Sequence, residues 1–417
     1  MATRSTPAVS AGAPNYTGPF LTVAVLFGIF GFLTSLNNQL VAKLEEVFKL
    51  THGPAMLATA AWFLAYLVFS VPSGKLIEMV GYKRTMVISL FIMVVGALMF
   101  VPAANQVSFS LTLTAIFVLA TGVCALQTSA NPYVAILGPE HSASARLNLA
   151  QAFNSGASAV APWVAATFIL AHSGKAATAA MEAHMLEWPY IAIAAALLVL
   201  GFAVMFMHLP AIVSTQAFRP AKEGDPLLAR NIWSYRHTVL GMVGIFFYVG
   251  IEISLAAIGI RFCQQQGVSN VETAGFMVLL YYIGIMVGRF LGSFLMKWIK
   301  AEKILVSLGI LGVVLLFVSM FASGPVAVSA LVLCGLANSV MYPTIFALGI
   351  AELGPLTSKG SGVITIGNVG GAVIPVLFGV MADKVGIQYA FILPIMGYIY
   401  VAYYGQWGHK PSRTVAA

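Results

Sequence analysis

The stretch from Thr85 to Pro139 contains no Asp, Glu, Lys or Arg. It is too long for one membrane-spanning helix, which needs about 20 apolar residues, and VPAANQ at Val101–Gln106 divides it into two. The whole chain is 60% hydrophobic and 8% charged, whereas soluble domains carry roughly 25% charged residues. The sequence therefore predicts an all-α membrane protein that crosses the bilayer many times.

Hydropathy predicts twelve transmembrane helices in two six-helix bundles. The expected spans are about 20–41, 54–77, one on each side of 101–106, 147–171, a sixth ending near 209, 237–260, 274–296, 304–321, 326–351, 362–381 and 387–407. The domains then follow as an N-terminal tail (1–18), an N-terminal bundle (19–210), a polar inter-bundle loop (211–236), a C-terminal bundle (237–408) and a C-terminal tail (409–417).

Lys and Arg concentrate in every second loop, counted from the N-terminus. The segments on the opposite side hold only Lys43, Lys49, Lys175, Arg261 and Lys384. This asymmetry predicts that both termini and the inter-bundle loop are cytoplasmic, in the plasma membrane (the inner membrane of a bacterium). It also explains the net charge of +8 without a nucleic-acid partner. The N-terminal stretch has no apolar core followed by a small-residue cleavage site, so we expect no cleaved signal peptide.

An internal repeat supports the division into two halves. CALQTSANPYVAILGP (Cys124–Pro139) resembles CGLANSVMYPTIFALGIAELGP (Cys334–Pro355), and FNSGASAVAP (Phe153–Pro162) resembles GNVGGAVIP (Gly367–Pro375). The offset between matching residues is almost constant along both pairs. Two pseudo-symmetric halves with a binding site between them are typical of secondary transporters.

Amide side chains recur inside the predicted spans, where an unpartnered polar group is costly. Amides offer donors and acceptors without charge, which suits the hydroxyls of a neutral sugar. The candidate sugar ligands are Asn37, Asn38, Gln127, Asn131, Gln151, Asn154, Asn338 and Asn368. The alternative for each is a hydrogen bond between helices. The aromatic candidates for stacking on a sugar ring are Trp62, Tyr66, Trp163, Tyr281, Tyr282 and Tyr342, of which we favour Tyr342 because Pro343 follows it in the repeat.

GKLIEMVGYKR (Gly74–Arg84) resembles the signature loop of the major facilitator superfamily, with Glu78 where that family usually has Asp. The resemblance assigns a conformational role to Gly74, Glu78, Gly81, Lys83 and Arg84. The glycines permit close helix approach, and we expect Glu78 to meet the N-terminus of the eleventh span near Ser361. The alternative is a charge that only orients the spans.

LQTSANPY, LGPE and RLNLAQAFNS, together with the Asn37–Asn38 pair and YVGIEIS at Tyr248–Ser254, resemble the fucose–galactose–glucose–proton symporter family. The resemblance implies a hexose or 6-deoxyhexose substrate. It also places an essential acid of the fucose symporter at Asn38 and another at Gln127, and an amide cannot take up a proton. Glu252 in span seven is the acid that remains clearly inside the membrane. It could act as a proton carrier, as a sodium ligand or as part of a structural pair. Arg289 in span eight is expected to gate or anchor.

The sequence thus predicts a secondary transporter that imports a neutral hexose, with glucose or galactose favoured over fucose, fructose, mannose and N-acetylglucosamine. Proton coupling is favoured over sodium coupling and over uncoupled uniport. We expect no enzymatic activity because no HExxH or paired intramembrane acids occur. A membrane sugar sensor is the alternative of another class, although it would need a signalling domain. We expect no cofactor and no metal, a small-molecule sugar and membrane lipid as partners, no nucleic acid, and a monomer.

Overall fold

The computed structural model describes residues 17–47, 52–164, 167, 187–207, 231–268 and 270–411; at 17, 37–47, 52–56 and 271 it describes the backbone alone. The expectations for the N-terminal tail to residue 16, most of the inter-bundle loop and the end of the C-terminal tail therefore lie outside the described residues. So do the side chains of Asn37 and Asn38.

The N-terminal bundle consists of long helices. They are α1 (Thr17–Val47), α2 (His52–Val80), α3 (Tyr82–Asn105), α4 (Phe109–Ile136), α5 (Ala143–Val164) and α7 (Glu187–Phe206), with the short η1 (Glu140–Ser142) before α5. In this bundle α1 packs on α5, and α4 packs on α2 and α3. The predicted break at 101–106 is confirmed, because α3 ends at Asn105 and α4 begins at Phe109.

The C-terminal bundle follows after η5 (Ile232–Ser234). Its helices are α8 (Arg236–Gln265), α9 (Val271–Leu295), α10 (Ala301–Phe321), α11 (Gly324–Asn338), α12 (Met341–Gly349), α13 (Thr357–Ile366), α14 (Gly370–Val385), α15 (Ile387–Ala390) and α16 (Ile392–Tyr403), with the single turns η6 (Gly354–Leu356), η7 (Gly367–Val369) and η8 (Tyr404–Gly408). Within the described residues, 11 helices or helix pairs are long and apolar enough to span a membrane. The 22-residue α5, rich in amides, is a further long helix.

The predicted tenth and eleventh spans are present, but each is interrupted. The tenth is divided into α11 and α12, and the eleventh into α13, η7 and α14. Pro343 explains the first break, because it has no N–H for the carbonyl of Ser339, four residues earlier, and its ring crowds that carbonyl. At the second break a Cβ on Gly370 would lie 1.8 Å from the Phe246 carbonyl oxygen. Glycine there lets the broken span lie directly on α8.

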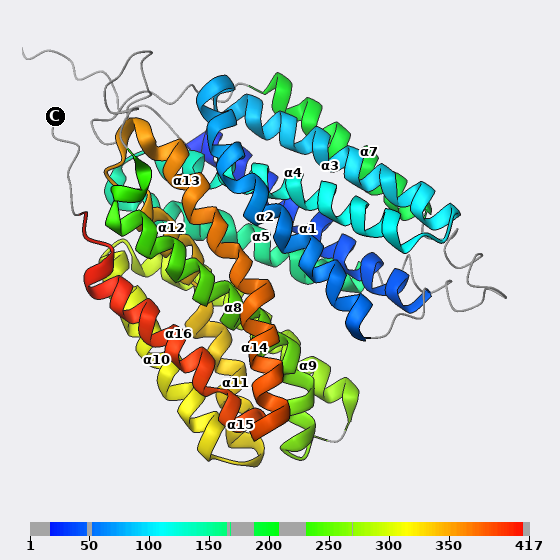
Figure 1. Ribbon diagram of the computed structural model, residues 1–417. Coiled ribbons are helices and arrows are strands. Elements are labelled where there is room, and N and C mark those ends of the chain that lie inside the picture. Colours follow the sequence, from blue (N-terminus) through cyan, green and yellow to red (C-terminus); the bar gives the residue numbers. More distant parts are fainter. Residues whose placement is uncertain are drawn as a thin grey trace, which may run out of the picture.

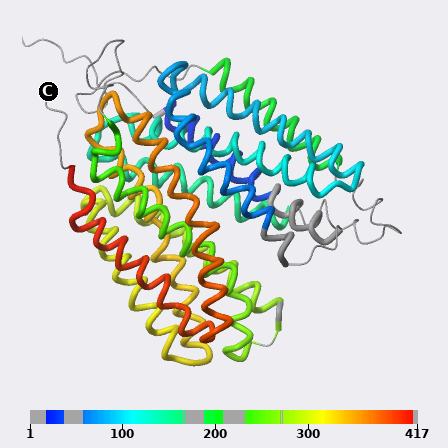
Figure 2. The backbone as a smooth tube through the Cα atoms, viewed as in Figure 1, coloured from blue at the N-terminus to red at the C-terminus, as the bar shows by residue number. Residues whose placement is uncertain are grey.

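The two bundles meet at one end and separate toward the other (Figures 1 and 2). At the joined end α2 and α4 contact α13, and α5 contacts α9 and α12. The Ser361 hydroxyl donates to the Thr128 carbonyl oxygen at 2.6 Å, and Asn148 Nδ2 donates to Thr344 Oγ1 at 3.1 Å. The joined end is the one that carries the loops at Gly81 and at Glu140–Ser142.

Both copies of the sequence repeat have the same local structure at this end. In each, Leu-Gly-Pro follows a helix, the glycine has positive φ (Gly138 134°, Gly354 53°), and a single 3₁₀ turn leads into the next helix, α5 or α13. Glycine adopts this backbone conformation at little cost. The repeat seen in the sequence is therefore present in the structure as well.

Candidate functional site

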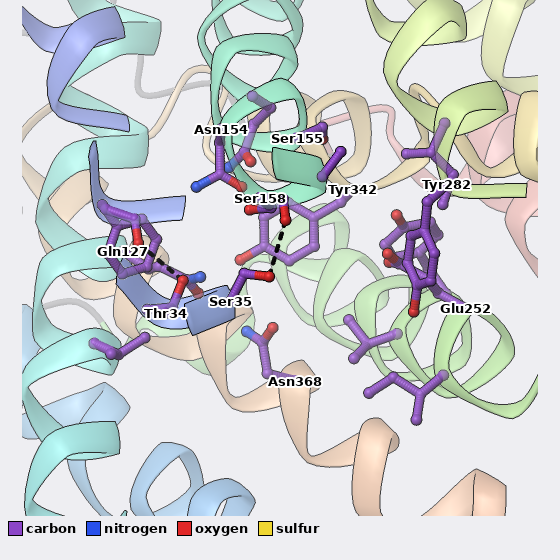
Figure 3. Close-up of a pocket in the computed structure, with 18 of the residues that line it drawn as sticks. Thr34, Ser35, Gln127, Asn154, Ser155, Ser158, Glu252, Tyr282, Tyr342 and Asn368 are labelled. Atoms are coloured by element: carbon purple, nitrogen blue, oxygen red, sulfur yellow. Dashed lines mark hydrogen bonds between the residues drawn. The ribbon is translucent and has the colours of Figure 1, made fainter. Parts of the chain in front are cut away.

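A cavity of about 490 Å³ lies between the bundles, where they begin to separate. Both bundles line it. Its walls are formed by Phe30, Thr34, Ser35, Trp62, Phe63, Tyr66, Val123, Gln127, Gln151, Asn154, Ser155, Ser158, Ala159 and Pro162 from the N-terminal bundle, and by Tyr248, Val249, Glu252, Ile253, Leu279, Tyr282, Ile285, Arg289, Tyr342 and Asn368 from the C-terminal bundle. Figure 3 shows Gln127 and Thr34 on one wall facing Glu252 and Tyr282 on the other. A volume of this size suits a small-molecule ligand.

The amides of the N-terminal wall are held by specific partners. The Tyr66 hydroxyl donates to Gln127 Oε1 at 3.2 Å, which leaves both N–H groups of Gln127 Nε2 as donors to the cavity. Asn154 Nδ2 donates to the Phe27 carbonyl at 3.0 Å, so its Oδ1 remains an acceptor. Gly31 allows this approach of α1 to α5, since a Cβ there would lie 2.5 Å from Asn154 Nδ2. One amide thus offers donors and the other an acceptor.

At three positions a proline leaves a backbone carbonyl without its partner in the same helix, and that carbonyl accepts a hydrogen bond from another helix. A proline lacks the N–H that would bond to the residue four positions earlier. Pro162 frees Ser158 in this way, and the Ser35 hydroxyl donates to that carbonyl at 2.9 Å. The Thr128 carbonyl, freed by Pro132, accepts from Ser361 across the bundles. The third is Ser339, freed by Pro343.

Arg289 of α9 joins three segments at the edge of the cavity. Its side chain is 7% exposed. Its Nε donates to the Ser339 carbonyl at the break in the tenth span at 3.0 Å, and its Nη1 donates to the Gln151 carbonyl at 3.2 Å and to Ser155 Oγ, both on α5. The guanidinium therefore connects the C-terminal bundle to the amide-bearing helix of the N-terminal bundle.

Three of the seven buried side-chain polar atoms without a hydrogen-bond partner among the described residues lie at or behind the cavity. Among the described residues, the hydroxyls of Tyr248 and Tyr342 and Nδ2 of Asn131 are buried with no such partner. Each such atom costs about 1–3 kcal/mol when nothing satisfies it. Both tyrosines line the cavity, and Asn131 lies behind Gln151, whose Nε2 donates to Asn131 Oδ1 at 3.3 Å. Unsatisfied donors at a cavity wall indicate a place where a polar ligand can bind.

Glu252 lies on the C-terminal wall beside Tyr282 (Figure 3). It is half-buried, and its carboxylate is close enough to the hydroxyls of Tyr248 and Tyr282 to interact electrostatically. Within the described part of the chain, no Lys, Arg or His forms an ion pair with it. A carboxylate in such a position can exchange a proton or a cation with the cavity.

The signature loop lies at the joined end of the bundles. Glu78 Oε1 accepts from the Ser358 hydroxyl at 3.2 Å and lies 4.0 Å from Lys359 Nζ, so it meets the first turn of α13. A Cβ on Gly74 would lie 2.7 Å from the Ser358 carbonyl oxygen. Only glycine at this position allows α2 and α13 to pack this closely.

A second acidic contact crosses the same end. Glu140 in η1 and Glu352 after α12 come from opposite bundles. Partial burial raises the pKa of Glu140 and the nearby Glu352 carboxylate raises it further, while a hydrogen bond from the Glu352 backbone N–H opposes both effects. Protonation of Glu140 thus favours contact between the bundles.

Nine of the candidates for binding the sugar or the coupling ion line one cavity, and others do not. The nine are Gln127, Gln151, Asn154, Asn368, Glu252, Trp62, Tyr66, Tyr282 and Tyr342. Asn338 lies elsewhere, since its Nδ2 donates to the Tyr281 hydroxyl at 2.6 Å and its Oδ1 accepts from the Tyr398 hydroxyl at 2.9 Å, all inside the C-terminal bundle.

Ser155, Ser158 and Tyr248 also line the cavity, although they were not expected from the sequence, and so does Arg289, which was expected to gate or anchor. A signal existed for the serines. Gln151, Asn154, Ser155 and Ser158 follow the i, i+3, i+4, i+7 spacing of one helix face, and all four line the cavity. Within the described residues, no three His, Cys, Asp or Glu side chains cluster in a way that could hold a metal ion.

Comparisons with known proteins agree with this architecture. The model of the Major Facilitator Superfamily matches residues 20–367. A glucose/galactose transporter of Brucella abortus is 40% identical over 399 residues, which cover 95% of each chain. A structure of the Escherichia coli fucose:proton symporter FucP has a TM-score of 0.85 at 27% identity, covering 96% of this chain and 100% of that one.

A FucP structure in the outward conformation has a TM-score of 0.84 at 28% identity, covering 95% of this chain and 100% of that one. These relatives are transporters and not enzymes. The family resemblance predicted from the sequence is thereby confirmed. With its two helix bundles and its signature loop at the joined end, the chain belongs to the major facilitator superfamily.

Proposed function

We propose that this protein is a secondary transporter that imports a neutral hexose by alternating access. The observation that carries the proposal is the cavity, in which uncharged donors and acceptors from both bundles face one another. Gln127 offers two N–H groups, and the buried hydroxyls of Tyr248 and Tyr342 lie beside Glu252, Arg289 and Asn368. A sugar binds through many hydroxyls that each donate and accept, so these groups complement it. A ligand held by both bundles would also couple binding to their relative movement.

Glucose or galactose is the favoured substrate. The Brucella abortus relative, a glucose/galactose transporter, supports this choice. The family resemblance predicts an acid at the position of Gln127 in the fucose symporter, and Gln127 is an amide. Fucose, fructose, mannose and N-acetylglucosamine are the alternatives, because a single unpaired buried hydroxyl is worth about 1–3 kcal/mol.

Glu252 is proposed to carry the coupling ion, with a proton favoured. It is a cavity carboxylate without an ion-pair partner among the described residues, and the amide of Gln127 cannot replace it as a proton acceptor. A sodium ion is the alternative, since carboxylate oxygens suit hard cations. A uniporter would need no ion at all.

The cavity is proposed to face the outside in the arrangement described. The joined end carries Lys83, Arg84 and Arg146, and such residues favour the cytoplasmic side. The separated end then faces outward, and both termini are cytoplasmic. The similarity to FucP in its outward conformation supports the same assignment.

The test is counterflow in proteoliposomes with a panel of labelled sugars, followed by uptake driven by a pH gradient or a sodium gradient. Counterflow of glucose or galactose is expected, with accumulation under a pH gradient. If only another hexose shows counterflow, that hexose is the substrate in place of glucose or galactose. If the sugar accumulates only under a sodium gradient, sodium is the coupling ion in place of the proton. Absence of counterflow for every sugar, with protein correctly inserted, would refute the proposal.

A further inference from the structure

A second hollow, of about 680 Å³, lies on the other side of α5. Apolar side chains and glycines alone line it. They are Ala24, Val25, Gly28, Ile29 and Phe32 of α1, Ala152, Phe153, Gly156, Ala157 and Val160 of α5, and Met286 and Phe290 of α9. None of these residues lines the polar cavity. The face of α5 that lines it is thus distinct from the face that carries the candidate sugar ligands.

Small residues form the floor of this apolar groove and larger ones form its rim. Gly28 and Gly156 carry no side chain, whereas Val25 is 50% exposed and Val160 is 48% exposed. The groove therefore opens toward the surroundings of the protein. In a membrane protein these surroundings are hydrocarbon at the depth of the spans.

The groove bridges the two bundles. Its α9 wall belongs to the C-terminal bundle, and the rings of Phe153 and Phe290 meet edge to face with centroids 6.0 Å apart. A Cβ on Gly156 would lie 3.3 Å from Met286 Sδ. The groove is complete only while α5 and α9 pack together. A ligand that fills it would therefore stabilise this arrangement of the bundles over any other.

A cationic group follows the groove along α9. Phe294 is one helical turn beyond Phe290 and is 53% exposed. Lys297 Nζ lies 5.1 Å from the centroid of the Phe294 ring, and the exposed Trp298 packs against the same ring at 4.6 Å. Among the described residues Lys297 has no ion-pair partner. An apolar groove that leads to an aromatic pair and a free ammonium matches an acyl chain joined to an anionic headgroup.

We propose that one acyl chain of an anionic phospholipid occupies the groove, with its headgroup at Lys297. The chain lies against Gly28 and Gly156 and passes Phe290 and Phe294 toward the lysine. This proposal is independent of the sugar and of the coupling ion.

The experiment measures lipid retained by the purified protein in native mass spectrometry, from micelles that contain phosphatidylglycerol and phosphatidylcholine with identical chains. Ile29→Trp fills the groove from its rim, and Val199→Trp places the same side chain on an exposed site of α7 as its control. Lys297→Gln removes the cation, and Lys384→Gln on α14 is its control.

The unaltered protein should retain phosphatidylglycerol about fivefold better than phosphatidylcholine, as one lysine near a membrane surface implies. Lys297→Gln should abolish that preference and keep lipid binding, whereas Ile29→Trp should lose both. The two controls should match the unaltered protein. If Ile29→Trp retains as much lipid as the unaltered protein, the proposal is overturned. It is also overturned if the unaltered protein is a dimer of this chain that retains no lipid. The readout does not involve transport, so either result leaves the sugar proposal untouched.

Discussion

Replacing Gln127 by Leu is expected to weaken sugar binding while leaving the fold intact. Gln127 Oε1 is occupied by the Tyr66 hydroxyl, so the two N–H groups of its Nε2 are what the side chain offers to the cavity. Each neutral hydrogen bond is worth about 0.5–1.5 kcal/mol. Loss of two costs about 2 kcal/mol, which corresponds to a roughly 30-fold higher dissociation constant. Isothermal titration calorimetry of the purified protein with galactose measures this constant directly.

Two further variants separate the causes. Tyr66→Phe removes the hydroxyl that holds the amide but keeps both N–H donors, so a smaller loss is expected. Gln388→Leu removes an amide whose Nε2 donates to the Ala322 carbonyl at 3.4 Å, away from the cavity, and should leave the affinity unchanged. If Gln127→Leu binds galactose within twofold of the unaltered protein, or if Gln388→Leu loses as much affinity, the assignment of Gln127 as a ligand is wrong.

Three other predictions concern coupling and the joined end. Glu252→Gln should abolish sugar accumulation driven by a pH gradient but retain counterflow, because exchange needs no net ion movement. If uptake driven by the gradient equals that of the unaltered protein, Glu252 does not carry the coupling ion. Gly74→Leu should reduce counterflow at least tenfold, because a Cβ at this position lies 2.7 Å from the Ser358 carbonyl oxygen. A cysteine that replaces Ser358 should react faster with a thiol reagent in this variant than in the otherwise unaltered protein. Unchanged reactivity would contradict this prediction. Burial and the Glu352 carboxylate raise the pKa of Glu140 in the folded protein. The folded state therefore binds more protons than the unfolded state, and stability falls as the pH rises from the pKa of Glu140 in the unfolded chain through its pKa in the folded chain. Glu140→Gln should flatten this slope and raise stability near neutral pH by under about 1 kcal/mol, since solvent screens a carboxylate that is only partly buried. An unaltered pH profile of thermal unfolding would oppose this.

The sequence predicted the positions and order of the apolar spans, because hydropathy depends only on local composition. It did not predict the breaks within the spans. Pro343 and the glycines at Gly367 and Gly370 were visible, but prolines also occur inside continuous helices here, as Pro132 does in α4. Whether a proline breaks a helix depends on which group donates a hydrogen bond to the freed carbonyl. For Ser339 that partner is Arg289, which is far away in the chain.

The break also explains why only one of two neighbouring candidates reached the cavity. Asn338 and Tyr342 are four residues apart and would share a face of a continuous helix. The turn between α11 and α12 separates them, so Tyr342 lines the cavity while Asn338 bonds to two tyrosines inside its bundle. The amide pattern identified Gln127, Gln151 and Asn154 on the unbroken helices α4 and α5, although Asn131 on α4 lies behind the cavity wall.

The three-way contact of Arg289 has a consequence for the order in which the chain enters the membrane. Its acceptor at Gln151 precedes it by 138 residues, and its acceptor at Ser339 follows it by 50. A charged side chain within a span costs up to about 2.5–3.5 kcal/mol on insertion, with the largest cost at the centre. When α9 leaves the ribosome, α5 is already present to receive the guanidinium, but the broken tenth span does not yet exist. The N-terminal bundle thus provides the first polar partner for a helix of its neighbour, so the two halves would assemble together during synthesis and not as separate units joined afterwards.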